Sequence, residues 1–301
     1  MKLPALGAAA LALVCGAAVA QQTDPQAPAR PTAEQFMAQL KPQHGAVKLP
    51  NGVASLQLPD DFYYLTPDDS EKLLVDAWGN PPGDKTLGMI IPQAISPLSR
   101  EGWGVVITYS DDGHIKDDDA AKIDYSELLT KMKQEDEENN KKRKEQGYAA
   151  LNLIGWAAPP YYDAQAHKLY WAKELKAADA TDNTLNYEIR VLGRKGVLEL
   201  TAVAQMSNFP AIKGEMTKVL AFTNFDQGNR YSDFNISTDK VAAYGLAALV
   251  AGGVAAKVGL LAKLGVLLLA LKKFVILGAV AVAGFFRKLF GGKPKNTPPA
   301  A

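Results

Sequence analysis

The carboxy-terminal part of the sequence contains an apolar run of 46 residues, from position 241 to position 286. The run has no acidic residue and no proline, and its only charged side chains are Lys257, Lys263, Lys272 and Lys273. A water-soluble domain does not end in so long an apolar run, whereas a helix that crosses a membrane needs about 20 mostly apolar residues. The sequence therefore predicts a helical membrane anchor at the carboxy terminus.

The length of this membrane region, residues 239–290, sets its topology. The 46-residue apolar run within it would be about 69 Å long as a single α-helix. The hydrocarbon core of a bilayer is only ~30 Å thick. The region therefore crosses twice, or crosses once and continues as a helix in the interface. Residues 241–262 form one natural span, while Lys272 and Lys273 near the middle of residues 264–286 favour contact with lipid headgroups. We prefer a single crossing, and a hairpin stays open as the alternative.

Two further features of this region concern its partners. We expect six basic residues to contact headgroups or the aqueous side of the bilayer: Lys257, Lys263, Lys272, Lys273, Arg287 and Lys288. Ala248, Gly252 and Ala256 recur every four residues, a pattern that lets another helix approach closely and would allow self-association. A basic, proline-containing tail follows at residues 291–301.

The amino terminus indicates export. Residues 1–20 contain Lys2, an apolar core and an Ala18-Val19-Ala20 cleavage pattern, which is typical of a secretory signal peptide. The only cysteine, Cys15, lies within it, so the mature chain has no disulfide, zinc–thiolate site or cysteine nucleophile. We expect a flexible linker at residues 21–44 and a location at the bacterial inner membrane, with the domain in the periplasm or outside the cell.

The charge distribution separates body from tail. All 32 acidic residues lie between Gln21 and Asp239, together with 23 of the 33 basic residues, which gives that region a net charge of −9. From Lys240 onward the chain has nine basic residues and no acidic residue. This arrangement suits an anionic lipid surface for the tail and argues against nucleic acid as a partner of the body.

Residues 45–238 predict an α+β domain with a mainly antiparallel sheet and about three helices. Asn51-Gly52 between short apolar runs predicts a hairpin with a type I′ turn, and Gly193–Gly196 predicts a second hairpin. Capping patterns predict helices at residues 66–79, 124–146 and 208–222. The second half of the middle helix is polar all round, so we expect it to project into water.

No sequence motif in the chain specifies a reaction. The three histidines, His44, His114 and His167, lie outside any metal-binding or hydrolase motif, and no cofactor fingerprint is present. Residues 110–119 form an acidic loop whose carboxylates suit calcium, although the EF-hand spacing is absent. The metal candidates in this loop are Asp111, Asp112, Asp117, Asp118 and Asp119.

Several blocks of the chain together resemble a known group of sequences. They include LPDDFYYL at residues 58–65, WGVVITYSDDG at residues 103–113 and YSDFNISTDKVAAYG at residues 231–245. They resemble an uncharacterised bacterial family of predicted membrane-anchored proteins, a domain of unknown function. That resemblance implies an envelope location and a carboxy-terminal anchor, and it assigns no catalytic residue. The order of elements in residues 184–225 is similar to the end of the PsbP/Mog1-like fold.

These observations favour a non-enzymatic envelope protein whose domain binds a protein or a cell-wall component. Two alternatives stay open. The first is a membrane-tethered, metal-assisted hydrolase that uses the acidic loop, and the second is an accessory protein of membrane transport that uses the lysine-bearing helices.

Overall fold

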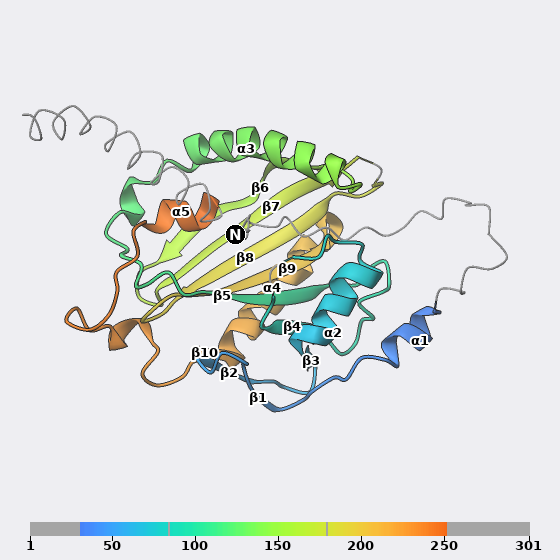
Figure 1. Cartoon of the computed structure of the whole chain (residues 1–301), viewed down its shortest axis with the longest axis horizontal. Coiled ribbons are helices and arrows are strands. Elements are labelled where there is room, and N and C mark those ends of the chain that lie inside the picture. Colours follow the sequence, from blue (N-terminus) through green and yellow to red (C-terminus); the bar gives the residue numbers. More distant parts are fainter. Residues whose placement is uncertain (1–30, 84, 179, 252–301) are drawn as a thin grey trace, which may run out of the picture. The chain divides into compact units, whose positions relative to one another are not determined.

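The computed structural model describes residues 31–83, 85–178 and 180–251, all within the first of two compact units, Met1–Gly253. The predicted signal peptide, the basic tail and most of the predicted membrane region lie outside these residues. Figure 1 shows a mixed structure of two antiparallel sheets and five α-helices, which confirms the α+β class. Among the described residues, no helix combines the length and the apolar character needed to cross a membrane.

Two antiparallel meanders build the larger sheet. The first contains β3 (Phe62–Leu65), β4 (Gly88–Pro92) and β5 (Gly104–Ser110). The second contains β6 (Leu151–Asp163), β7 (Lys168–Ala177), β8 (Thr184–Leu192) and β9 (Val197–Gln205). Pairing of β5 with β9 joins them in the order β3-β4-β5-β9-β8-β7-β6, so the described edge strands are β3 and β6.

The smaller sheet contains the first predicted hairpin, and here the turn differs from the prediction. Strands β1 (Ala46–Lys48) and β2 (Ala54–Gln57) pair, and β10 (Thr223–Phe225) adds to β2. A type I′ turn needs positive φ at both central residues, but only Gly52 has it, at 69°. The Gly52 N–H instead donates to the Leu49 carbonyl, because Pro50 fits the second position of an ordinary turn.

The larger sheet is covered on both faces. On one face, α4 (Phe209–Phe222) and the smaller sheet pack on the main core, to which β8 contributes Leu185, Tyr187, Ile189 and Val191. The other face carries separate apolar clusters under the helices α2, α3 and α5, which lie on the opposite side of the sheet from α4 in Figure 1.

The three predicted helices are present with their predicted starts. Thr66 caps α2 (Pro67–Glu71), and the helix continues as a π-helical turn, η1 (Lys72–Ala77). Asp124 caps α3 (Tyr125–Glu145) by accepting from the N–H groups of Ser126 and Glu127. Pro210 occupies the first turn of α4. Two more helices, α1 (Ala33–Met37) and α5 (Leu246–Ala251), raise the number above the expected three.

The composition of α3 predicted that its second half projects into water. The structure shows instead that this half packs along β6. The Asn140 side chain is only 7% exposed, and it accepts from the Leu151 N–H at 2.8 Å and donates to the Leu151 carbonyl at 3.2 Å. One turn earlier, Asp136 accepts from the Leu153 N–H at 2.8 Å. These two side chains occupy backbone groups at the free edge of β6, so a polar helix covers a polar strand edge.

The structured domain extends beyond both predicted boundaries. Upstream, Leu40 is buried and Gln43 pairs with Tyr64, so residues 33–44 are not the expected free linker. Downstream, Leu246, Leu249 and Val250 are at most 4% exposed and join the core cluster beneath α3. The span predicted at residues 241–262 is therefore wrong for its first eleven residues, which belong to the domain. Hydropathy alone does not separate a buried helix from one in lipid.

Candidate functional site

The most elaborate group of side chains lies where the chain leaves the domain. We call residues 226–245, between β10 and α5, the connector. It runs past the loop after β5, the β6–β7 turn and the β8–β9 turn, all at one end of the larger sheet. We call the contacts between the connector and these loops the connector site.

The β6–β7 turn places His167 for this site. The Asp163 carboxylate accepts from the N–H groups of Gln165 and Ala166, which closes a tight turn. His167 then has a φ of 52°, the only positive φ of a non-glycine residue in the described chain. Such a conformation is rare for a side chain of this size and persists only where surrounding contacts fix it.

Four rings stack across the site and hold the connector against the loops. His114 lies between Phe234, whose ring centroid is 3.9 Å away, and Tyr231, at 4.3 Å. The other side of Tyr231 stacks on His167 at 4.0 Å. The stack thus alternates connector aromatics with histidines of the sheet loops.

The Asp117 carboxylate lies beside the stack and contacts polar atoms of Tyr162 and His167. The Tyr162 hydroxyl donates to Asp117 Oδ2 at 2.6 Å, and His167 Nδ1 lies 3.5 Å from the same oxygen. Burial alone would raise the pKa of Asp117, but the Tyr162 and Tyr231 hydroxyls and the nearby His167 lower it overall. Burial and the Asp117 carboxylate raise the pKa of Tyr162. Asp117 is therefore an ionised acceptor and Tyr162 a neutral donor.

The His114 ring is buried and electrically neutral. Burial lowers its pKa below the ordinary value, and this effect outweighs the opposing influence of the Gly193 and Arg194 carbonyls and of Asp117. Its Nδ1 atom is buried and has no hydrogen-bond partner among the described residues. The stack therefore contains a histidine whose protonation would be unfavourable.

An ion pair fixes the middle of the connector. Asp239 accepts from Arg194 Nε at 2.7 Å and from Arg194 Nη2 at 3.1 Å, a two-pronged arrangement. The Asp239 side chain is only 1% exposed. Its hydrogen bonds with Arg194 and with the Asn235 N–H lower its pKa to about 2, so it is ionised over the whole physiological range.

Main-chain bonds continue the attachment as a short parallel bridge. The His114 N–H donates to the Lys240 carbonyl at 2.8 Å, and the Ala242 N–H donates to the His114 carbonyl at 2.9 Å. Gly113 next to it has a φ of 116°, and a Cβ atom there would lie 2.7 Å from the Lys240 carbonyl oxygen. A glycine is required at position 113 because the two chain segments approach so closely.

The acidic loop of residues 110–119 forms hydrogen bonds with the connector and with the start of α5. Asp112 accepts from the Tyr244 hydroxyl at 2.5 Å, and Asp119 accepts from the Leu246 N–H at 3.4 Å. Asp117 faces Tyr162, while Asp111 and Asp118 are exposed. In the part of the chain that the structure describes, no group of three or more histidine or acidic side chains has the geometry to hold a metal. Of the five candidate aspartates, Asp112, Asp117 and Asp119 therefore contact three different partners.

The residues predicted to meet lipid fall elsewhere. Lys257, Lys263, Lys272, Lys273, Arg287 and Lys288, and also Gly252 and Ala256, lie outside the described residues. Ala248 of the small-residue stripe lies in α5 and is half-buried in the domain.

A second polar group lies on the sheet face that carries α2, α3 and α5. Glu188 on β8 lies 3.1 Å from Lys173 Nζ and 2.8 Å from Arg190 Nη1, and it accepts from the Thr201 hydroxyl at 2.7 Å. Arg190 also pairs with Glu199 at 3.3 Å and stacks over the Trp171 ring. Burial alone would raise the pKa of Glu188, but Lys173 and Arg190 lower it to about 2. The two cations and two carboxylates of this group pair with one another, so we interpret it as a structural ion-pair network.

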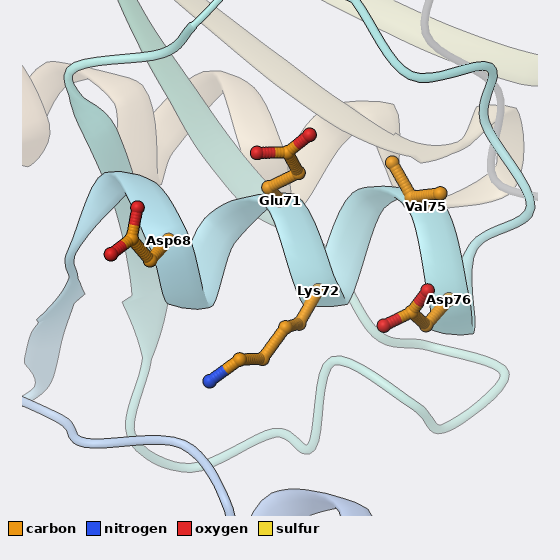
Figure 2. A pocket seen from close by; sticks show the side chains of 5 residues that line it. All are labelled: Asp68, Glu71, Lys72, Val75 and Asp76. Atoms are coloured by element: carbon orange, nitrogen blue, oxygen red, sulfur yellow. The ribbon is translucent and has the colours of Figure 1, made fainter.

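Two shallow cavities lie away from the connector site. One, of about 330 Å³, lies on the outer surface of α2 and η1. Figure 2 shows its lining residues Asp68, Glu71, Lys72 and Asp76 on this helix. The other, of about 340 Å³, lies beside Met37, His44 and Tyr63.

The sequence reasoning missed most of the connector site. It assigned no role to residues 226–239, although Tyr231 and Phe234 within that segment were a signal of packing. It also assigned none to His114 and His167, because neither lies in a known motif. Several contacts that build the site join residues 45 to 134 positions apart, as in the Asp117–Tyr162 and Ser110–Tyr244 pairs, which spacing cannot reveal.

Comparisons with known proteins give a family and a fold. A family model described as "Protein of unknown function (DUF2167)" matches residues 41–283. No functionally curated protein matches the sequence. The structure is similar to cyanobacterial PsbP from Synechocystis sp. PCC 6803, with 7% identity, a TM-score of 0.34 and coverage of 62% of this chain and 92% of that one.

It is also similar to the Ran-binding protein Mog1p of Saccharomyces cerevisiae, with 8% identity and a TM-score of 0.33, over 65% of this chain and 100% of that one. Both resemblances expected from the sequence are thus confirmed. The second is weak and carries no argument about function.

Proposed function

The chain belongs to the family described as protein of unknown function DUF2167, and we propose that it is an exported, membrane-anchored binding module. In this proposal the α+β domain is held at the bacterial inner membrane by its carboxy-terminal segment and faces the periplasm or the outside. The domain binds a protein or cell-wall component of the envelope and catalyses no reaction.

The observation that carries the proposal is the way the domain holds its own carboxy-terminal end. Three independent kinds of contact fasten the connector: stacked rings, the Arg194–Asp239 ion pair and main-chain bonds to His114. The described residues then end in α5 at Ala251, and the sequence that follows, residues 252–286, is apolar apart from its lysines. Because the connector is fastened to the domain by these contacts, an anchor that follows it would hold the domain firmly at the membrane.

The chemistry of the connector site supports a mechanical role over a catalytic one. Asp117, Tyr162 and His167 form a hydrogen-bonded group that resembles acid–base machinery. Each of these side chains also faces the aromatic stack, which includes Tyr231 of the connector. The Tyr231 hydroxyl of the connector also interacts with Asp117, so this group contributes to holding the connector.

Cysteine accessibility tests the anchoring directly, because a Cys15→Ser chain has no cysteine. Single cysteines would replace Tyr161, which is 64% exposed on β6, and Ala301 at the carboxy terminus. In intact spheroplasts, a membrane-impermeant maleimide should label the cysteine at position 161. A single crossing predicts labelling at position 301 only after permeabilisation, whereas a hairpin predicts labelling without it.

Two results would contradict the proposal. Labelling at position 161 that requires lysis would place the domain in the cytoplasm. Recovery of the whole chain in the soluble fraction after alkaline extraction would show that it has no membrane anchor.

The binding role needs its own test. Crosslinking of the full chain in intact cells should give a discrete adduct that is absent when residues 31–251 are replaced by an unrelated exported domain. If both proteins gave the same adducts, partner binding by this domain would be ruled out and anchoring would stand.

A further inference from the structure

The connector presents an apolar side chain to solvent at its tip. Ile236 is 84% exposed, and the other exposed large apolar side chains of the described residues are Tyr161 at 64% and Ile154 at 43%. Both of those lie on strand β6, whereas Ile236 lies in the loop of residues 235–238, between η4 (Tyr231–Asp233) and α5. In Figure 1 the segment between η4 and α5 is the outermost loop at that end of the larger sheet.

This loop is rigid, although all four of its residues are exposed. Asn235 Oδ1 accepts from the Ser237 N–H at 3.0 Å, and the Asn235 carbonyl accepts from the N–H groups of Thr238 at 3.1 Å and Asp239 at 2.8 Å. The Asn235 N–H donates to Asp239, which Arg194 holds in place. The loop therefore holds Ile236 outward in one conformation, and little conformational entropy would be lost if it were bound.

Basic side chains surround the loop. Lys195 is 60% exposed and its Nζ lies 4.0 Å from Asp239, while Lys240 follows Asp239 in sequence and Arg230 precedes η4, both of them exposed. The exposed acidic residues on the neighbouring loop after β5 are Asp111 and Asp118. These basic residues are notable because the region from Gln21 to Asp239 has a net charge of −9, although α3 also carries exposed lysines at positions 141, 142 and 144.

The loop also lies close in sequence to the predicted anchor. Between Ile236 and Ala251 lie 14 residues. The stretch from Asp239 to Leu246 is bonded to Arg194, His114 and Asp119. The same end of the domain therefore carries the exposed isoleucine, the basic residues and the last described helix.

We propose that the loop of residues 235–238 binds the surface of an anionic bilayer, with Ile236 in the interface and Lys195, Arg230 and Lys240 beside the phosphate groups. An isoleucine gains free energy when it leaves water for the acyl boundary, and basic residues near a negatively charged leaflet add electrostatic attraction. The inference rests on the proposed function, because an anchored domain keeps the loop near lipid. It adds a second contact that would fix how the domain is oriented on the membrane.

The test uses the full-length mature chain, reconstituted in vesicles, with a polarity-sensitive fluorophore on one introduced cysteine. Ile236→Cys is the test position, and Ile154→Cys is the matched control, since it also replaces an exposed isoleucine. Leu268→Cys, in the apolar run, reports on the anchor. Each protein is compared in detergent, in phosphatidylcholine vesicles and in vesicles that also contain phosphatidylglycerol.

We expect the probe at position 236 to shift its emission to the blue and to lose quenching by aqueous iodide in the phosphatidylglycerol vesicles. The probe at position 154 should stay quenched in all three, and the probe at position 268 should be protected in all vesicles. The substitutions Lys195→Gln and Lys240→Gln together should reduce the protection at position 236 and leave position 268 unchanged.

The two proposals fail separately. If position 236 is quenched as strongly as position 154 while position 268 is protected, the loop does not bind lipid and the anchor stands. If position 268 is also quenched, the membrane anchor itself is wrong. If position 236 is protected equally without phosphatidylglycerol, the assignment of the basic residues to anionic lipid is wrong.

Discussion

His114 is the residue on which the acid sensitivity of the connector site depends. The groups that face it are the rings of Phe234 and Tyr231, the carbonyls of Gly193 and Arg194, and the charges of Asp117 and His167. Because burial lowers the pKa of His114 in the folded state, the unfolded chain binds the proton more tightly. The free energy of unfolding must therefore fall as the pH drops below about 6.5.

Replacement of His114 by phenylalanine tests this coupling. His114→Phe keeps a ring in the stack and removes the titrating group, so the variant should lose less stability than the wild type between pH 7 and pH 5. Urea unfolding at several pH values measures the difference. His44→Phe is the control, since His44 is exposed, and it should keep the wild-type pH profile. An unchanged profile in His114→Phe would show that another group controls this range.

A second acid transition should survive that substitution. The pKa of Asp239 is held at about 2 by Arg194 and the Asn235 N–H, below its ordinary value near 4. Its contribution to stability is complete above pH 4 and is lost as the pH falls toward 2. In Arg194→Gln the loss of stability in this acid range should be smaller, and circular dichroism during acid titration would show it.

At this scale the sequence could suggest the residues but not their partners. The density of carboxylates in residues 110–119 pointed to a cation, because spacing along the chain was the only geometry available. The structure shows Asp112 bonded to Tyr244 and Asp119 bonded to Leu246. Contacts across 127 or 132 residues depend on the complete fold.

Among the elements, α3 shows how a polar helix can be an integral part of a domain. Most of its surface is charged, yet Asp136 and Asn140, one turn apart, bind backbone groups of Leu151 and Leu153 on β6. The helix thereby protects an edge strand that would otherwise offer free N–H groups to other chains.

Asn140→Ala should therefore destabilise the domain, by about 1–3 kcal/mol, because the Leu151 N–H is left buried without an acceptor. Asn139→Ala is a matched control on the adjacent, exposed position, and it should be neutral or slightly stabilising because alanine favours helix. Chemical denaturation of both variants gives the comparison. Equal stability of the two would mean that the edge of β6 does not need α3.

Strand β8 gives the second prediction at this scale. Glu188 neutralises both Lys173 and Arg190 at a position that is 4% exposed. Glu188→Ala leaves Lys173 without this partner and Arg190 with Glu199 alone, and removal of one member of a buried pair costs about 3–5 kcal/mol. Glu127→Ala removes an exposed partner of Lys131 and should cost under about 1 kcal/mol. If the two substitutions had equal effects on the unfolding midpoint, the network would be unimportant for stability.

Elements were predicted well where local chemistry decides them. Thr66 and Asp124 cap helices as expected, and strand β8 ends in the hairpin predicted at Gly193–Gly196. The role of the polar face of that strand was not predictable, since alternation of Asn186, Glu188 and Arg190 with apolar residues is typical of a strand with one face in water. Burial of that face depends on elements far away in the sequence.

For the whole molecule, the structure shows that the domain does not end where the polar sequence ends. Helix α5 already consists of residues from the apolar run. Sequence hydropathy predicted a boundary at residue 238, because buried helices and membrane helices share the same side chains. The distinction comes from packing, here of Leu246, Leu249 and Val250 in the cluster with Trp171 and Leu192.

Two soluble fragments test this boundary. A fragment of residues 21–251 should fold cooperatively, whereas residues 21–239 should not. The shorter fragment lacks three side chains that are at most 4% exposed in the domain, each contributing about 1.5–3 kcal/mol, and this total approaches the roughly 5–15 kcal/mol that stabilises a typical domain. Thermal unfolding followed by circular dichroism, with sedimentation to detect aggregates, compares them. If both fragments unfolded at the same temperature, α5 would be dispensable for the domain. Residues 240–251 would then belong to the membrane region.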